Sequence, residues 1–329
     1  MSHRELEDPS MKPQMKSSET YYIGIDISKD KIDVFTRHSD SVQSMPNDPK
    51  AIGRWITEIT KQHKKPHLVC EATGGYEKPL LREAFALDCP ISLVNARSMR
   101  SFADAMSQHA KTDPIDAKMI TRFAEVKCPA ALEKPTATQE ALQALGRRRA
   151  SLTNRITQEK NALQKADNAT VKQDIKTSMR DLEKRLEKFD KKIDELVTGD
   201  KELKSKRERI ESIKGMGRVS ANTILAELPE IENLTEKQVS ALIGVAPFPK
   251  DSGKSKGKRL TQGGRARVRR GLYMAAQSAS RFNHVLSEFY KRLRSKGKSH
   301  RVAVIAVMRK LVCLIGRLLK DPEFRLEEG

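Results

Sequence analysis

The chain has 329 residues, of which 37% are hydrophobic, and this is enough apolar material for two domains with separate cores. Lysine and arginine number 63 against 43 acidic residues, which gives a net charge of +20 at pH 7. The composition excludes wholesale disorder, and the charge indicates a polyanionic partner held partly by counterion release.

The N-terminal part has the pattern of an α/β domain. Residues 1–20 are polar, lack periodicity and contain two prolines, which is typical of a disordered tail. Short apolar or alternating runs at 21–27 and 31–37 then predict a hairpin of strands. Further on we expect helices at 49–63, 76–87, 97–107 and 114–126, with strands at 67–71 and 91–95. This order favours an RNase H-like (RuvC-like) α/β domain over residues 21–133.

Residues 134–205 have a heptad pattern. Leu145, Leu152 and Ile156 fall at a/d spacing, although Arg149 and Glu159 occupy two positions of the same seam. A second run, from residue 182 to 196, alternates steps of four and three. The pattern predicts a coiled coil of two long helices joined near residue 168. It leaves open whether they form an antiparallel pair within one chain or a dimerising coiled coil.

Residues 206–329 are expected to form a compact, mainly helical domain, and they carry 27 basic against 12 acidic side chains. The segment 250–270 holds nine basic residues and four glycines, which is typical of a phosphate-binding loop or of a solvated surface loop. The segment 213–217 resembles a helix-hairpin-helix turn, but a glycine C-cap explains it equally well. The residues predicted to contact nucleic acid are Gly215, Gly217, Lys254, Lys256, Lys258, Arg259, Arg265, Arg267, Arg269 and Arg270.

Four acidic residues are spaced so that their carboxylates are able to meet at one site. Asp26 ends the first strand, Glu71 ends a later strand, and Asp113 and Asp116 lie three apart at the start of a helix. Strand ends meet at one edge of a sheet and an i,i+3 pair shares a helix face, so together they are able to hold one or two Mg²⁺ ions. Asp113, which precedes Pro114, equally suits a structural N-cap.

The sequence also contains candidate nucleophiles and gives an indication of the cellular compartment. Ser252 and Ser255 lie in the basic loop, where either hydroxyl is able to serve as a nucleophile beside a metal or a base. The cysteines are too widely spaced for zinc pairs and too few for a disulfide scaffold, which favours a reducing, cytoplasmic setting; they are Cys70, Cys89, Cys128 and Cys313. No segment predicts a signal peptide or a membrane span.

These motifs together resemble one family, the transposases of the insertion sequence 110 family, which is related to the Piv-type DNA invertases and described as bridge-RNA-guided recombinases. The resemblance runs from Tyr22 to about Leu319. Its N-terminal marks are Tyr22-Ile-Gly-Ile-Asp26, Cys70-Glu71-Ala-Thr-Gly74 and Lys111-Thr-Asp113-Pro-Ile-Asp116-Ala117. Its C-terminal marks are Ile213-Lys-Gly215-Met-Gly217, Leu242-Ile-Gly244-Val-Ala246-Pro247, Ser252-Gly253 and Arg269-Arg270-Gly271-Leu-Tyr273-Met274.

The resemblance implies a mechanism and named residues. Asp26, Glu71, Asp113 and Asp116 would form a DEDD magnesium site, and Ser252 would attack a DNA phosphate to leave a covalent phosphoserine, with Ser255 as the reserve candidate. The segment 261–264 departs from the family pattern, because relatives often carry Ser-Lys before the glycine. Arg259 and Arg265 are expected to replace any phosphate contact of that lysine.

The same resemblance implies the partners. They are donor and target double-stranded DNA, a noncoding guide RNA, and a second copy of the chain in a homodimer that becomes a tetramer at the synapse, with domains of different protomers composing one active site. The location implied is the prokaryotic cytoplasm, associated with the nucleoid and with no membrane partner. Two other hypotheses stay open: a RuvC-like junction-resolving endonuclease, which tolerates loss of Ser252, and a nucleic-acid scaffold without catalysis.

Overall fold

The computed structural model describes residues 20–37, 41–106, 113–248, 251–252, 255–256 and 260–324, and for 113–115, 251–252 and 255–256 it describes the backbone alone. The chain divides into two compact units, Met1–Lys134 and Pro135–Gly329. The expected tail lies outside the described residues except for Thr20. The predicted boundary between coiled coil and helical domain, at residue 205, stays a prediction.

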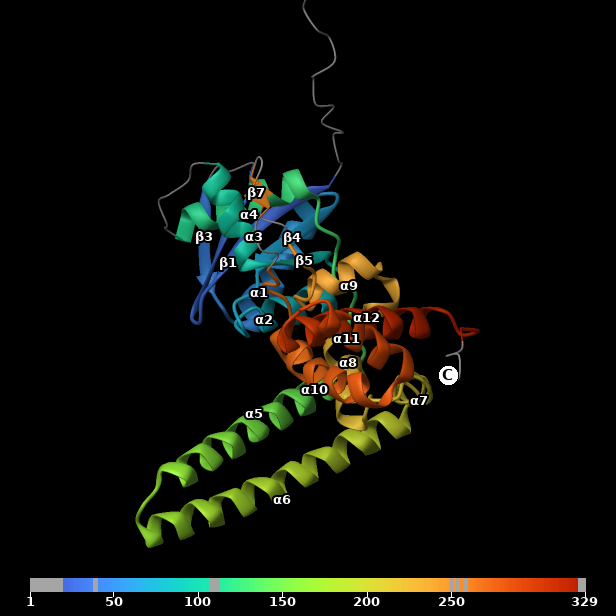
Figure 1. The fold of residues 1–329 in the computed structure, drawn as a ribbon. Helices are drawn as coiled ribbons and strands as arrows, with labels where there is room; N and C mark the ends of the chain where they lie inside the picture. Colours follow the sequence, from blue (N-terminus) through green and yellow to red (C-terminus); the bar gives the residue numbers. More distant parts are fainter. Residues whose placement is uncertain are drawn as a thin grey trace, which may run out of the picture. The chain divides into compact units, whose positions relative to one another are not determined.

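The first unit is built on a mixed sheet of five strands in the order β3-β2-β1-β4-β5 (Figure 1). Their bounds are β1 Tyr21–Ile27, β2 Lys31–Phe35, β3 Val42–Pro46, β4 Pro66–Glu71 and β5 Ile91–Val94. The first three strands pair antiparallel, whereas β4 is parallel to β1 and β5 is parallel to β4. The sequence did not predict β3, because this edge strand is largely exposed and carries no apolar alternation.

Helices cover both faces of this sheet. They are α1 Pro49–Gln62, α2 Lys78–Ala86, α3 Ala96–Ala105 and α4 Asp113–Lys127. One core joins α1 and α2 to the strands through Ile52, Ile56 and Leu80, and the other joins α3 and α4 through Met99 and Ile120. Asp48 caps α1 by accepting from the Ala51 amide at 3.1 Å.

The second unit begins with a long helical hairpin, made of α5 Ala137–Lys165 and α6 Ala169–Gly199, which lie side by side in Figure 1. Asn168 ends the connection and caps α6 through the Thr170 and Val171 amides. A narrow apolar seam of Leu152, Ile156 and Leu182 holds the two helices together. Within one chain, therefore, the heptad pattern forms an antiparallel pair.

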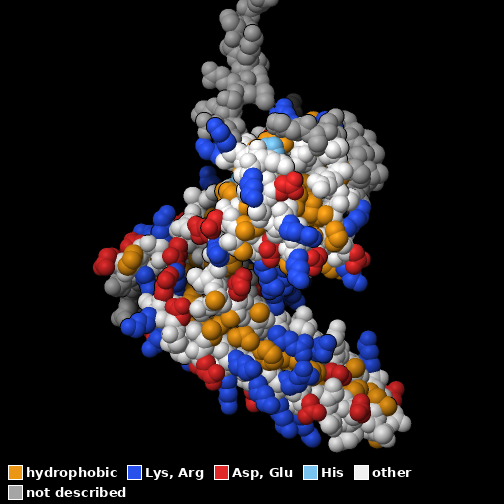
Figure 2. All heavy atoms as spheres, turned by 180° about the vertical axis from the view of Figure 1, so that it is seen from behind, with side chains coloured by type: hydrophobic (Ala, Val, Ile, Leu, Met, Phe, Trp, Pro, Cys, Tyr) orange, Lys and Arg blue, Asp and Glu red, His pale blue; other side chains and the backbone are white. Residues whose placement is uncertain are grey.

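The two polar residues in the predicted seam have partners across this hairpin. The guanidinium of Arg149 donates to the Asp190 carboxylate at 2.5 and 3.3 Å, and Ser178 donates to Glu159 at 3.0 Å. Polar side chains are accommodated at these seam positions because their hydrogen-bonding groups have partners on the facing helix. Figure 2 shows lysine and arginine side chains gathered along the outside of the hairpin.

The remainder of the second unit is a mainly helical body. Its elements are α7 Lys201–Glu211, α8 Arg218–Glu227, the 3-10 helix η1 Ile231–Asn233, α9 Glu236–Leu242, β6 Asp251–Ser252, β7 Ser255–Lys256, α10 Ala266–Phe282, α11 His284–Ser295 and α12 His300–Lys320. The last helix is central, because its buried face, which includes Val307, Leu311 and Ile315, packs into the core shared with α8 and α10. Among the described residues, no helix is long and apolar enough to cross a membrane.

The predicted α/β fold of the N-terminal part and the helical fold of the C-terminal part are confirmed. The ends of the expected helices shift by at most two residues, for example to Lys78–Ala86 for the helix expected at 76–87. A larger difference lies at Asp200, where the second long helix ends and a separate helix begins. Asp200 accepts from the amides of Glu202 and Leu203 at 3.0 Å, so its side chain is the N-cap of α7.

Candidate active site

Asp26 and Glu71 lie at neighbouring positions of two adjacent parallel strands. The ladder between β1 and β4 pairs Ile25 with Cys70, and each acidic residue follows its member of that pair. Both are partly buried. Parallel strands run about 4.8 Å apart. The two predicted strand-end carboxylates are thus side by side at one edge of the sheet.

Both residues belong to the sheet face that α4 covers. Ile25 and Cys70 contribute to the core beneath α1 and α2, whereas Tyr22 and Val69 contribute to the core beneath α4. Successive residues of a strand point to opposite faces. Asp26 and Glu71, one position after Ile25 and Cys70, therefore fall on the α4 face.

The helix α4 runs antiparallel to β1, and this direction decides where its acidic residues lie. Its C-terminal neighbour Cys128 lies beside the Tyr22 hydroxyl, while the middle of the helix contacts Gly24. The Gly24 amide donates to the Thr121 hydroxyl at 2.8 Å, and that hydroxyl donates to the Ala117 carbonyl at 3.2 Å. Asp26 lies two residues beyond Gly24 along β1. The first turn of α4 lies one turn before Ala117, in the direction of the helix N-terminus.

That first turn contains the remaining two predicted carboxylates. Asp113 is the first residue of α4, and Asp116 immediately precedes Ala117, which contacts β1. The helix therefore brings this turn to the same edge as Asp26 and Glu71. The Asp113 side chain lies outside the described residues, and among those described no group of three or more His, Cys, Asp or Glu is close enough to hold a metal ion.

The chemistry of this donor set nevertheless suits a hard cation. All four residues supply carboxylate oxygens, which are the ligands that Mg²⁺ prefers, and there is no thiolate or imidazole among them. The nearby Cys70 thiol is buried, and burial raises its pKa well above the usual range. It belongs to the core beneath α1 and α2, on the face of the sheet opposite to Asp26 and Glu71.

A carboxylate that the sequence did not single out fixes the turn after Glu71. Glu77 accepts hydrogen bonds from the Thr73 hydroxyl at 2.5 Å, the Gly75 amide at 2.8 Å and the Thr73 amide at 3.3 Å. Burial alone would raise the pKa of Glu77, but these hydrogen bonds outweigh it and lower the pKa. The only sequence signal was a Thr and Gly turn followed by an acidic residue before a helix.

The serine candidates lie in the second unit, on a short antiparallel ribbon. The strands β6 and β7 pair Ser252 with Ser255 and Asp251 with Lys256, so the segment has more regular spacing than the sequence indicated. Nearer its base, the ribbon is joined by a bridge between Phe248 and Leu260. The side chains of both serines lie outside the described residues.

Close glycine contacts hold the base of this ribbon against the helical body. A Cβ on Gly264 would lie 2.7 Å from the Gly244 Cα, with the Gly244 amide nitrogen closer still, and both residues have positive φ. The Arg265 amide donates to the Leu242 carbonyl at 2.9 Å. No side chain fits between these segments, so only glycine permits the contact.

The arginines after the ribbon all have partners inside the second unit. Arg265 pairs with Glu230 at 2.5 Å, and Arg267 pairs with Glu227 at 3.1 Å. Arg269 donates to the Gly263 carbonyl, and Arg270 donates to Asn154 at 3.4 Å. Of the other predicted nucleic-acid contacts, Lys254, Lys258 and Arg259 lie outside the described residues, and Lys256 is described by its backbone in β7 alone.

The predicted helix-hairpin-helix turn contains two glycines with different surroundings. Gly215 has φ +103° and its Cβ would lie 2.6 Å from the Ala279 amide nitrogen, so it allows the turn to pack on α10. Gly217 is the N-cap of α8 and has open space where a Cβ would be. The first glycine has a packing role, and the second leaves the start of α8 accessible.

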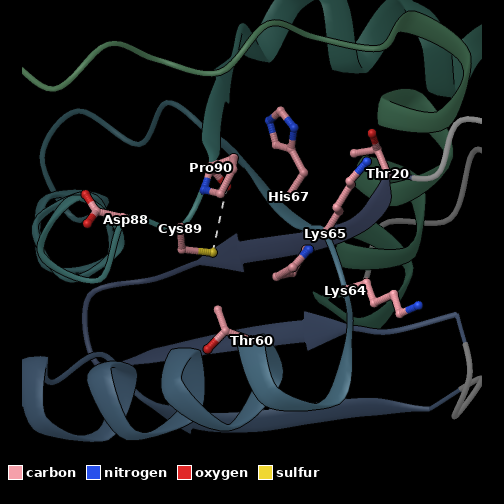
Figure 3. Close-up of a pocket in the computed structure, with 9 residues that line it drawn as sticks. Thr20, Thr60, Lys64, Lys65, His67, Asp88, Cys89 and Pro90 are labelled. Carbon is pink, nitrogen blue, oxygen red and sulfur yellow. Dashed lines mark hydrogen bonds between the residues drawn. The ribbon is translucent and has the colours of Figure 1, made fainter.

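A separate pocket lies at the other end of β1 and β4. Its volume is about 410 Å³, and its lining comprises Thr20, Thr60, Lys64, Lys65, Pro66, His67, Asp88, Cys89 and Pro90 (Figure 3). His67 is engaged by the Ser92 hydroxyl at 2.7 Å, and burial lowers its pKa. Burial raises the pKa of the Cys89 thiol to about 11. The pocket therefore offers no ready thiolate, and it lies at the opposite end of the strands from the carboxylate edge.

Known protein families and relatives match both parts of the chain. The sequence model of the DEDD transposases of the IS110 type, described as "Transposase", matches residues 23–168, and that of the "Transposase IS116/IS110/IS902 family" matches residues 207–291. The "Pilin gene-inverting protein" of Moraxella lacunata is 26% identical over 302 residues, covering 89% of this chain and 94% of that protein. Its counterpart in Moraxella bovis matches equally. An uncharacterised 44.8 kDa protein of insertion element IS116 from Streptomyces clavuligerus is 26% identical over 136 residues, covering 39% of this chain and 34% of that protein.

An α/β unit with a carboxylate edge, a basic helical unit and these matches define a transposase, an enzyme that recombines DNA. The chain belongs to the IS110 family of transposases. DNA is accordingly its substrate, and transposases of the DEDD type generally use a divalent metal ion.

Proposed function

We propose that this transposase cuts and rejoins the DNA of an insertion sequence, with Asp26, Glu71, Asp113 and Asp116 as its metal ligands and Ser252 as its nucleophile. The observation that carries the proposal is the adjacency of Asp26 and Glu71 at one sheet edge, which supports a site there. Asp26 and Glu71 follow the last pair of the β1–β4 ladder, and α4 begins at the same edge. Mg²⁺ is the ion that an all-carboxylate site favours.

We further propose that the first unit is RNase H-like. Support comes from the strand order β3-β2-β1-β4-β5, with an antiparallel first half, parallel β4 and β5, and helices on both faces. In such a sheet the ends of β1 and β4 are adjacent, so residues distant in sequence share one edge. This is the placement that a carboxylate nuclease site requires.

The proposed step conserves the phosphodiester energy. The Ser252 oxygen forms a bond to phosphorus, the bond from phosphorus to one deoxyribose oxygen breaks, and the displaced strand leaves with a hydroxyl that has gained the serine proton. A hydroxyl of another strand then reverses this step and releases the serine. A bound divalent ion would polarise the scissile phosphate and stabilise its developing charge. A hydrolytic nuclease needs no such serine.

Three further features of the proposal concern partners. The chain would act as a dimer that becomes a tetramer at the synapse, so that the serine ribbon of one protomer serves the carboxylate edge of another. A noncoding bridge RNA would select donor and target DNA by base pairing, while the protein contacts backbone and shape. The basic second unit, with lysines and arginines along its hairpin (Figure 2), supports binding of nucleic acid.

The test is to trap the covalent intermediate. Purified protein, its guide RNA, labelled insertion-sequence DNA and Mg²⁺ are combined and separated on denaturing gels, for wild type, Ser252→Ala, Ser255→Ala and Asp26→Asn. We expect a protein-linked DNA band that Ser252→Ala and Asp26→Asn abolish and Ser255→Ala retains. Free nicked DNA persisting in Ser252→Ala would favour the junction-resolving nuclease, and full activity of Asp26→Asn would favour the scaffold.

A further inference from the structure

The turn between Glu71 and α2 is held rigidly from the inside. Glu77 accepts from the Thr73 hydroxyl and from the Gly75 amide, so both ends of the turn are tied to one carboxylate. These hydrogen bonds lower the pKa of Glu77, and an ionised carboxylate binds amides and hydroxyls more strongly than a neutral acid does. The turn that follows Glu71 is therefore closed by hydrogen bonds among its own residues.

Asn47 ties the same turn to the strand that carries Asp26. Its side-chain amide donates to the Ser28 carbonyl and to the Tyr76 carbonyl, each at 3.0 Å, and its backbone amide donates to the Asp30 carbonyl at 3.0 Å. Since one nitrogen makes both side-chain bonds, the carbonyl oxygens of Ser28 and Tyr76 are at most 6.0 Å apart. Tyr76 is thereby held at the edge where Asp26 and Glu71 lie.

The side chain of Tyr76 is open to solvent although its backbone is fixed. Its exposed fraction is 48%, and no other aromatic residue in the described part of the first unit is as exposed. A Cβ on Gly74 or Gly75 would meet nothing within 4 Å, so the outside of the turn is open as well. Single exposed aromatic residues are common on protein surfaces. This one is distinguished by its fixed position beside the carboxylates.

We propose that Tyr76 is a substrate-contact residue, whose ring packs against a nucleobase or deoxyribose of the DNA strand next to the scissile phosphate. An aromatic ring on a fixed backbone loses little conformational freedom on binding, and base stacking on such rings tolerates any sequence. The contact would orient the strand over the carboxylate edge. This inference rests on the proposed function, because it takes that edge as the site of cleavage.

The experiment measures DNA cleavage by the full chain at increasing concentrations of labelled insertion-sequence DNA, with guide RNA and Mg²⁺, for Tyr76→Phe, Tyr76→Leu and Tyr76→Ala. We expect KM for DNA to rise about tenfold in Tyr76→Ala and Tyr76→Leu, and to stay within about twofold of wild type in Tyr76→Phe. The matched control is Leu87→Ala, an exposed apolar residue at the other end of α2, which should leave KM and kcat unchanged.

Asp26→Asn is measured alongside to separate the two claims. If Asp26→Asn is inactive while Tyr76→Ala and Tyr76→Leu keep the wild-type KM, the tyrosine contact is wrong and the proposed function stands. If Asp26→Asn cleaves like wild type, the carboxylate edge is not the cleavage site and both claims fall. Thermal unfolding of each variant verifies that a changed KM does not come from loss of the fold.

Discussion

Replacing Gly24 by alanine should move the Asp26 carboxylate of β1 away from the two acidic residues in the first turn of α4. A Cβ at this position would lie 2.6 Å from the Thr121 amide nitrogen, and the Ala117 carbonyl oxygen and the Thr121 hydroxyl would be closer still. Ordinary van der Waals contact begins at about 3.4 Å, so α4 must retreat by at least 0.8 Å. Because the obstructing atoms include backbone, rotation of a side chain does not remove the clash.

Two consequences of this displacement are measurable. Overpacking of a buried contact costs about 1–3 kcal/mol, so urea unfolding of Gly24→Ala should show that loss. A displacement of about 1 Å at a catalytic site lowers activity by about 100-fold. We expect DNA cleavage by Gly24→Ala to fall by that order while circular dichroism still shows a folded protein.

Two controls test the geometric argument. Gly53→Ala, in the middle of α1, meets the far end of the flexible Glu83 side chain, and alanine there should stabilise the helix by about 0.5–1 kcal/mol without loss of activity. The double change Gly24→Ala with Thr121→Ala removes the hydroxyl but leaves both backbone atoms in place. If this double variant regains wild-type activity, or if Gly24→Ala never loses it, the reasoning from backbone contact is refuted.

Three further changes test other contacts. Gly264→Ala places a Cβ against the backbone of the facing turn, so we expect it to abolish the covalent DNA adduct and to cost about 1–3 kcal/mol of stability. The control Gly297→Ala has the same φ of +75° but open space around the added Cβ, and it should keep the adduct. The lowered pKa of Glu77 means that its ionised form stabilises the fold above the unfolded value of about 4.5 and that this stabilisation disappears as pH falls through the folded pKa. Glu77→Gln should therefore be less stable than wild type at pH 7 in urea unfolding, with a difference that shrinks in acid; a constant difference would contradict the charge argument. A double-mutant cycle of Arg149→Met and Asp190→Asn should give a coupling of about 0.5–1 kcal/mol, and zero coupling would show that this ion pair does not help to align the hairpin.

The sequence predicted the elements that carry an apolar period. The strands that carry Asp26 and Glu71 were found because buried central strands consist of nearly continuous apolar residues. The edge strand Val42–Pro46 was missed because its exposed side chains have no reason to be apolar. The break at Asp200 had a local signal, a glycine followed by an N-cap residue, that the heptad pattern concealed.

The contacts that fix the carboxylate edge could not be predicted in the same way. The Gly24 amide bonds to Thr121, which is 97 residues away, and nothing in either local sequence specifies the other. Asn47 connects the chain after Asp26 to the turn after Glu71, and its role depends on the strand pairing being known first. Local patterns thus predict the elements, while the contacts that align them follow only from the tertiary structure.

This distinction bears on how the proposed active site is assembled. The carboxylate edge is aligned by contacts at Gly24 and Asn47 within the first unit, and the serine ribbon is anchored at Gly264 within the second. The contacts that hold each half of the proposed site therefore lie within a single unit. An active site composed from two protomers, as proposed above, would tie cleavage to assembly of the complex on DNA rather than to folding of one chain.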